Sequence, residues 1–235
     1  MLRAPRLSPS ERSPKQQEEL TRFLERSGVS VVPVYAVNPG ADAGAVNYGY
    51  AAGRDLAEVL GDPTTLAGLA NGLILRHYEL VTLAHDCGVV IADRWPGNAI
   101  VVPPGTVKLI DFDLGYSGQL DHLKLFEESF CILQSLALLA TKEALRLELQ
   151  RKLVASLVIR HGQVAARNAW RWLGDFYLSD GRPRHEASLP ADAYRPILLQ
   201  LVPSPLGAQG LIDPPPARPD PAVIYYTSLI LHRRG

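Results

Sequence analysis

The sequence predicts an α+β fold in which a small lobe, made of one helix and a β-hairpin, precedes a larger lobe that is mostly helical. Helical and strand patterns occupy separate stretches, with short strands inserted in the helical body, and do not alternate as a parallel sheet requires. The 235 residues are 47% hydrophobic and 20% charged, so the chain is globular and can bury a sizeable core.

The small lobe and the segment that follows it are expected over residues 15–52. Residues 1–14 contain two Ser-Pro pairs and are expected to be a flexible lead-in. A helix is expected to begin near Lys15, because apolar residues follow it at helical spacing. The β-branched run Val29–Val37 predicts a strand, and Ala45–Tyr50 predicts a second strand that pairs with it in a hairpin.

The larger lobe is expected over residues 53–202. A long apolar helix is expected over residues 66–87, where a glycine follows its last residue. Short apolar runs predict three further strands, namely Val89–Ala92, Ala99–Val102 and Val107–Ile110. From about Asp121 to about Tyr177 the pattern is helical, with breaks near Ala140 and Gly162.

The C-terminal segment, residues 203–235, differs in composition from the lobe before it. Seven prolines lie within residues 203–221, which predicts an irregular segment wrapped on the surface or a linker. Residues 223–231 are apolar, and their pattern fits a strand and a helix equally well.

Charge, cysteine content and hydropathy limit the possible partners. The 24 basic residues balance the 24 acidic ones, so no net charge attracts nucleic acid or an anionic membrane surface. Cys87 and Cys131 form no C-x-x-C pair, which argues against a zinc site or a disulfide framework. No apolar run is long enough for a signal peptide or a membrane span. We therefore expect a cytoplasmic protein without nucleic-acid or membrane partners.

Three polar residues between Gly88 and Gly115 have the spacing of a reactive site. Asp93 follows one short apolar run, Asn98 lies five residues later, and Asp111 follows another apolar run. Phosphoryl transfer needs hard oxygen ligands for Mg²⁺ and a carboxylate that orients the acceptor hydroxyl and takes its proton. Capping of loops by these side chains explains each residue singly, but it does not explain their joint spacing.

This stretch, with D-x-x-P-x-N followed by I-D-F-D, resembles the catalytic core of protein kinases and their relatives. The resemblance implies a protein-kinase-like fold with a reduced N-terminal lobe, ATP as substrate, and Mg²⁺ or Mn²⁺ as cofactor. It implies that Asp93 is the catalytic base, Asn98 the second metal ligand and Asp111 the main metal ligand. Asp113 stands where the family has glycine, and it is either a further metal ligand or a turn cap.

Two weaker features of the resemblance lie upstream. The segment YGYAAGRDL resembles the hinge of the family, although a strand leading into a capped helix explains it nearly as well. As a hinge it would bind adenine through the backbone of Tyr48, Gly49, Tyr50 and Ala51. The helix near Lys15 would be the regulatory helix of the small lobe. Glu19 is the candidate for its ion-pairing glutamate, Glu18 and Glu25 are alternatives, and a solvated charge explains any one of them.

The sequence departs from the family most clearly at the phosphate-binding elements. No glycine-rich loop precedes the first helix, and Lys15 is the only lysine before Lys108. Three explanations stay open. The small lobe is minimal, or one of three basic residues (Arg3, Arg6 or Lys15) replaces the missing lysine, or the natural chain starts upstream of Met1.

The catalytic-loop and activation-segment motifs are also altered. The His-Arg-Asp motif of the family reads Ile-Ala-Asp at Asp93, which argues against regulation by phosphorylation of an activation segment. The segment between Asp113 and Asp121 is short and lacks an Ala-Pro-Glu ending. Asp121 is expected either to tether the catalytic loop or to cap the following helix.

Three functions follow from these observations. The favoured one is a phosphotransferase that moves the γ-phosphate of ATP to a hydroxyl of a protein Ser or Thr. A small-molecule kinase of the aminoglycoside or choline type is an alternative, because the short segment after Asp113 leaves little platform for a peptide. A pseudokinase that serves as a binding or scaffold module is another alternative, which the missing lysine and glycine loop support and the intact Asp93, Asn98 and Asp111 oppose.

Overall fold

The computed structural model describes residues 8–37, 45–178, 189 and 191–201, and all structural statements refer to these residues. The architecture is α+β, as the sequence predicts. The helices are α1 (Pro14–Arg26), α2 (Leu56–Gly61), α3 (Ala67–Asp86), the 3-10 turn η1 (Pro96–Asn98), α4 (Leu120–Ala137), α5 (Glu143–His161), α6 (Gln163–Tyr177) and α7 (Ala191–Leu201).

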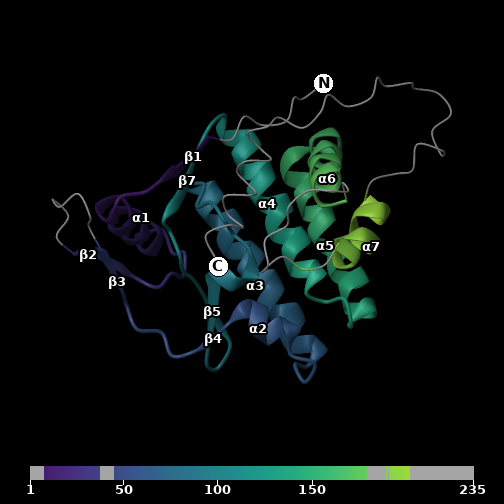
Figure 1. Cartoon of the computed structure of the whole chain (residues 1–235), viewed down its shortest axis with the longest axis horizontal. Helices are drawn as coiled ribbons and strands as arrows, with labels where there is room; N and C mark the ends of the chain where they lie inside the picture. The colour runs from purple at the N-terminus through teal and green to yellow at the C-terminus, as the bar shows by residue number, and fades with distance from the viewer. Residues whose placement is uncertain (1–7, 38–44, 179–188, 190, 202–235) are drawn as a thin grey trace.

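The strands form three small antiparallel sheets. They are β1 (Ser8–Glu11), β2 (Val34–Val37), β3 (Ala45–Tyr48), β4 (Arg54–Asp55), β5 (Ala99–Val102), β6 (Thr106–Leu109) and β7 (Leu114–Ser117). One sheet pairs β1 with β7, one is the β2–β3 hairpin, and the third has the order β4-β5-β6. Figure 1 shows α1 and the hairpin on one side of the molecule, the helices α4 to α7 on the other, and α3 between them.

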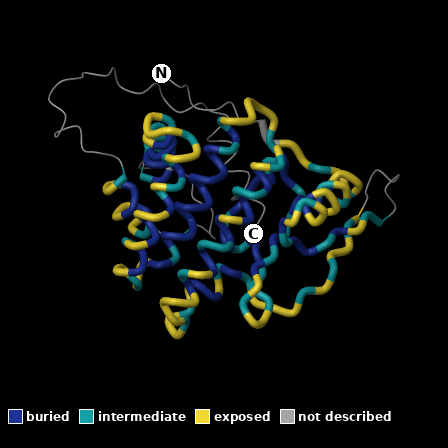
Figure 2. Tube along the Cα trace, turned by 180° about the vertical axis from the view of Figure 1, so that it is seen from behind, coloured by how far each residue is buried: buried dark blue, intermediate teal, exposed yellow. Residues whose placement is uncertain are grey.

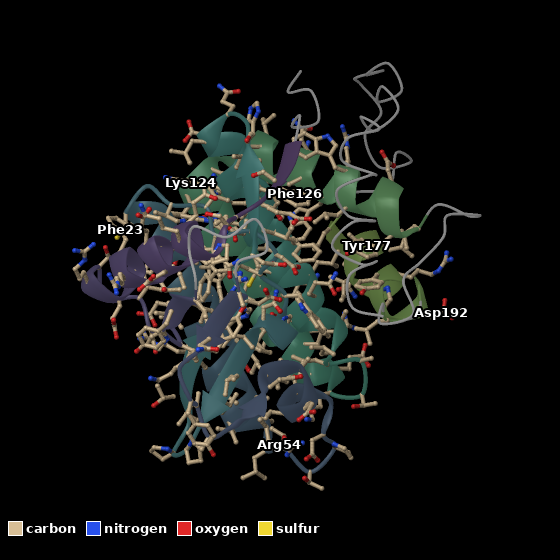
Figure 3. The ribbon with its side chains drawn as sticks, turned by 60° about the vertical axis from the view of Figure 1, so that its left-hand side comes forward. Phe23, Arg54, Lys124, Phe126, Tyr177 and Asp192 are labelled. Carbon is tan, nitrogen blue, oxygen red and sulfur yellow. The ribbon has the colours of Figure 1, made fainter. Side chains whose placement is uncertain are left out.

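The core is organised around α4. Every residue from Leu125 to Ala137 is buried, so this helix is covered on all sides, and α3, α5, α6 and α7 pack against it. Figure 2 shows the buried segments concentrated in this helical body. In Figure 3 Phe126 and Tyr177 lie within the body, whereas Phe23 lies on the outer side of α1.

The helix α1 begins and ends for local reasons and holds the hairpin. Ser13 and Gln16 form a capping box, and Pro14 occupies the first turn, where its missing N–H is not needed. On the side facing the hairpin, Thr21 Oγ1 accepts a hydrogen bond from Val34 N, and Glu18 accepts one from Ala36 N at 3.2 Å. The predicted hairpin and its helix are therefore one packed unit.

The strand predicted over Val29–Val37 is divided between two sheets. Only β2 pairs with β3. Earlier in the run, Val31 forms a parallel bridge with Leu109, and Val32 N donates to Leu109 O at 2.9 Å. The β-branched run therefore joins the hairpin unit to the sheet that precedes Asp111.

Two predictions of local structure are wrong. The lead-in expected over residues 1–14 contains strand β1, which pairs with β7, and Arg12 N donates to Asp113 O at 2.6 Å. The run Val89–Ala92 is buried or half-buried but is not a strand, because side chains bind the backbone oxygens of its last three residues and the amide of Ile91. Neither the β1–β7 pair nor the side-chain partners of residues 89–92 can be predicted from the local sequence, since the partners lie far away along the chain.

The other predicted boundaries within the described residues are close to the observed ones. The break near Ala140 lies between α4 and α5, and Gly162, at φ 85°, separates α5 from α6. The predictions for residues 203–235, including the apolar run 223–231, lie outside the described residues. No helix in the described part of the chain has the length and apolar character needed to cross a membrane.

The central position of α4 gives the first prediction. Leu133 is fully buried, so Leu133→Ala should lower the free energy of unfolding by about 2–5 kcal/mol through lost burial and a residual cavity. Leu199 is 62% exposed, and Leu199→Ala should change it by less than about 0.5 kcal/mol. Urea unfolding measures both, and equal losses would contradict the placement of α4.

Candidate functional site

The first two nominated residues meet in the loop that precedes β5. Asp93 is 5% exposed and Asn98, the last residue of η1, is 3% exposed. Asn98 Nδ2 donates to the backbone oxygen of Asp93 at 2.7 Å and to its carboxylate Oδ2 at 3.0 Å. The spacing of five residues therefore closes a compact loop with both side chains on its inner side.

The third and fourth nominated residues, Asp111 and Asp113, lie between β6 and β7. Ile110 N donates to Asn98 O at 3.0 Å, so the strand end before Asp111 is joined to the loop that carries Asp93. Burial, the negative charge and hydrogen bond of Asp111, and the charge of Asp93 raise the pKa of Asp113 to about 7. Three carboxylates thus lie within electrostatic reach of one another.

The backbone of these two loops is conformationally unusual. Among the described residues other than glycine, three have positive φ, namely Ala92 (75°), Asp93 (49°) and Asp111 (61°). Such conformations cost on the order of 1–3 kcal/mol each for residues with a Cβ, and they persist only where the surroundings hold them. Two of the three are nominated reactive residues, so the surroundings of these loops need an explanation.

Arg94 holds both loops from the inside. Its side chain is fully buried, and Nε donates to Ala92 O at 2.6 Å while Nη1 donates to Ile110 O at 2.9 Å. The same guanidinium also donates to the backbone oxygen of Asp111. It lies 5.4 Å from the centre of the Phe112 ring, which fits a cation–π contact. The planar fork of arginine thus joins the Asp93 loop to the Asp111 loop.

Arg12 holds the same loops from the N-terminal side. Its Nη1 donates to Ile91 O at 2.9 Å and to Leu114 O, and its Nη2 donates to Val90 O at 3.1 Å. Burial lowers the pKa of Arg12 to about 10, and the charge of Glu127 opposes this shift. These contacts explain why β1 lies beside β7 and why residues 89–92 need no strand partner.

Side chains accept hydrogen bonds from the backbone amides of Ile91 and Asp93. Glu127 Oε2 accepts a hydrogen bond from Ile91 N at 3.2 Å, and the Tyr116 hydroxyl accepts one from Asp93 N at 3.2 Å. Asp121, the predicted tether or cap, is exposed, and Gln119 is the N-cap of α4. The tether is instead Glu127, and its only sequence signal is a pair of glutamates within an apolar helix.

The predicted hinge residues lie at and after the end of β3. Tyr48 is half-exposed, and burial, followed by the charges of Asp111 and Asp113, raises the pKa of Tyr48 to about 12. Gly49 N donates to the backbone oxygen of Pro33 at 2.7 Å, so this amide already has a protein partner. Tyr50 is 95% exposed, and Ala51 is half-buried. Tyr48 therefore lies within electrostatic reach of the carboxylates.

Glu19, the candidate for an ion-pairing glutamate, pairs with a lysine of its own helix. Glu19 lies 3.8 Å from Lys15 one turn away on the exposed face of α1, so both charges are solvated. Glu19 also lines a polar cavity of about 350 Å³ between α1, β1 and β7, together with Arg12 and Tyr116. Glu18 binds the hairpin and Arg22, and Glu25 is exposed.

The candidate metal ligands offer oxygen donors but do not form a compact three-acid site. In the described ranges, no group of three or more His, Cys, Asp or Glu side chains is arranged to hold a metal ion. The nominated set combines an amide, on Asn98, with the carboxylates of Asp111 and Asp113, and hard oxygen donors of this kind suit Mg²⁺. The carboxylates of Asp111 and Asp113 repel each other, and a bound cation would relieve this repulsion.

No protein-family model matches this chain, and no curated protein matches it either. The resemblance to the kinase core therefore remains a prediction from the sequence motifs.

The contacts of Arg94 give the second prediction. Arg94→Leu leaves several buried carbonyl groups without a donor and should lower the free energy of unfolding by about 3–5 kcal/mol. Arg94→Lys keeps the charge but not the planar set of donors, and it should lower the free energy of unfolding by less than Arg94→Leu does. Arg167 is exposed on α6, so Arg167→Leu is the matched control and should lose less than about 0.5 kcal/mol. Chemical denaturation would contradict the bracing role if both leucine variants behaved alike.

Proposed function

We propose that this chain is a kinase-like phosphotransferase that moves the γ-phosphate of ATP to a hydroxyl group. The observation that carries the proposal is the convergence of the nominated residues. The amide of Asn98 donates to the carboxylate of Asp93, and the charges of Asp93 and Asp111 both act on Asp113. Loop capping alone does not require residues from two separate loops to share one charged centre.

Asp93 is the proposed catalytic base. Its carboxylate is nearly buried, and the hydrogen bond from Asn98 fixes its orientation. The bond from its own amide to the Tyr116 hydroxyl fixes the backbone on the other side. A carboxylate held in this way can align an acceptor hydroxyl for attack and take its proton.

Asn98, Asp111 and Asp113 are the proposed Mg²⁺ ligands. Bound Mg²⁺ would supply charge neutralisation for the phosphate groups. The protein supplies the oxygen atoms, and Arg94 keeps them in place by joining the backbone of both loops. Because the donors of Arg94 are directed at carbonyl groups, its charge moderates the carboxylate cluster without binding a carboxylate.

The short segment after Asp113 favours a small hydroxyl-bearing acceptor as a second candidate to a protein Ser or Thr. Strand β7 pairs with β1, and Gly118 and Gln119 then lead directly into α4. This stretch leaves no extended platform on which a peptide could lie. A binding module without catalysis is the other alternative, and the commitment of Arg12 and Arg94 to backbone carbonyls favours it.

Nucleotide binding is the third prediction. Mg-ATP should raise the melting temperature of the wild-type protein, because a ligand that binds only the folded state stabilises it, by about 2.7 kcal/mol at 100 times its dissociation constant. Asp111→Asn should lose the part of this shift that depends on Mg²⁺. Asp121→Asn, which removes an exposed carboxylate from α4, is the matched control and should keep it. No shift with any nucleotide and metal would reject the proposed site.

Group transfer is the fourth prediction. Asp93→Asn should keep the Mg-ATP thermal shift but lower the rate of phosphoryl transfer by about 100-fold or more, because the base is lost. Labelled ATP incubated with the protein, with and without cell extract, identifies whether label reaches protein or small solutes. Transfer by the wild type that Asp93→Asn leaves undiminished would refute the assignment of the base. Binding without any transfer would favour the binding module.

A further inference from the structure

His85 occupies an unusual buried position between two glutamates. It lies in α3 and faces α4, and its ring Nε2 is 2.7 Å from Glu127 Oε2 while its Nδ1 is 2.9 Å from Glu128 Oε1. All three side chains have no exposed surface. A neutral imidazole donates through only one nitrogen, so two carboxylate partners require either an imidazolium or a protonated glutamate.

The charges around this group come from three helices and from the N-terminal strand region. The titratable and charged neighbours are Tyr78 and Asp86 on α3, Glu127 and Glu128 on α4, Arg160 and His161 on α5, and Arg12 after β1. Arg160 Nε lies 3.1 Å from Glu128 Oε1 and also pairs with Asp86. Glu128 is thus compensated largely by α5, whereas Glu127 has His85 as its cationic hydrogen-bond partner.

Glu127 connects His85 to the loop that carries Asp93. The oxygen of Glu127 that contacts His85 also accepts the hydrogen bond from Ile91 N. Ile91 lies two residues before Asp93, and the intervening Ala92 has φ 75°. We infer that His85 is a positioning residue: as an imidazolium between Glu127 and Glu128 it fixes the carboxylate that holds Ile91 N, and its loss of a proton in alkaline solution loosens the Asp93 loop.

The pKa shifts have the signs that this arrangement requires. Burial disfavours the cation of His85, but the hydrogen bonds and charges of Glu127 and Glu128 outweigh it and raise the pKa of His85. Its contribution is therefore complete below the unfolded value of about 6.5 and is lost as pH rises through the folded pKa. Burial raises the pKa of Glu128, but the hydrogen bonds and charges of His161 and His85 outweigh burial, and the net effect lowers this pKa. The stability that Glu128 contributes is therefore lost only as pH falls through its lowered pKa.

Nitrogen NMR of the histidine rings in the full chain tests the charge state. Below the ordinary histidine pKa of about 6.5 both ring nitrogens of His85 should carry protons, and the ring should titrate at a higher pH than an exposed histidine. Glu128→Gln removes one negative partner and should lower that pKa by about 1 unit or more. Glu148→Gln, on the exposed face of α5, is the matched control and should leave it unchanged. A His85 ring that titrates at or below the ordinary histidine value in the wild type would overturn the inference.

Amide exchange of Ile91 tests the connection to the loop. After correction for the intrinsic exchange rate, the protection of this amide should fall as pH rises through the pKa of His85, and Glu128→Gln should move the fall to lower pH. His85→Gln should lower the protection at pH 6.5 about tenfold and remove its pH dependence. If the protection of the Ile91 amide does not change as His85 titrates, the inference is overturned. The Glu128→Gln variant decides this even if His85→Gln fails to fold.

The catalytic part of the inference rests on the proposed function. If the wild type transfers phosphate, the alkaline limb of its pH profile should move with the pKa of His85 in Glu128→Gln and stay in place in Glu148→Gln. If the alkaline limb of the pH profile lies at the same pH in both variants, His85 has no catalytic role. If the wild type transfers nothing, the proposed function fails, whereas the NMR and exchange measurements still decide whether His85 positions the loop.

Discussion

The arrangement of the site depends on one constraint, which is that two loops with few backbone partners of their own must be held together in a buried place. Arg94 meets this constraint from within, by donating to carbonyl groups of both loops. Arg12 donates to further carbonyl groups of the same loops. Buried carbonyl groups without donors are costly, so the two guanidinium groups replace the hydrogen bonds that strands would otherwise supply.

This replacement explains the local strain. Ala92, Asp93 and Asp111 adopt positive φ, which costs each a free energy that a regular strand would avoid. In this geometry Asp93 lies against Asn98, and Asp111 lies close to Asp113. The arginines, together with Glu127 and the Tyr116 hydroxyl, make that geometry stable by binding the backbone around it.

Local patterns in the sequence predict the hairpin and the helix breaks, because each depends on neighbours in the chain. The four polar residues of the candidate site are nominated by motif spacing, and their role stays a prediction. Local patterns do not predict the β1–β7 pair, in which Ser8 faces Ser117, since the two strands share no short-range pattern. Nor do they predict the roles of Arg12, Arg94 and Glu127. An arginine that binds distant carbonyl groups looks like a surface charge in the sequence, and Val90 and Ile91 look like a strand until their partners are known.

The use of both arginines for the backbone also limits how the proposed site would bind phosphate. A guanidinium directed at carbonyl oxygens cannot at the same time form a bidentate pair with a phosphate group. Lys15 lies on the exposed face of α1 beside Glu19, so it is already in a solvated pair. Under the proposed function, a metal ion at Asp111 and Asp113 would supply the charge that neutralises the phosphates. A site of this kind should depend on divalent metal more strongly than one in which a lysine shares the task.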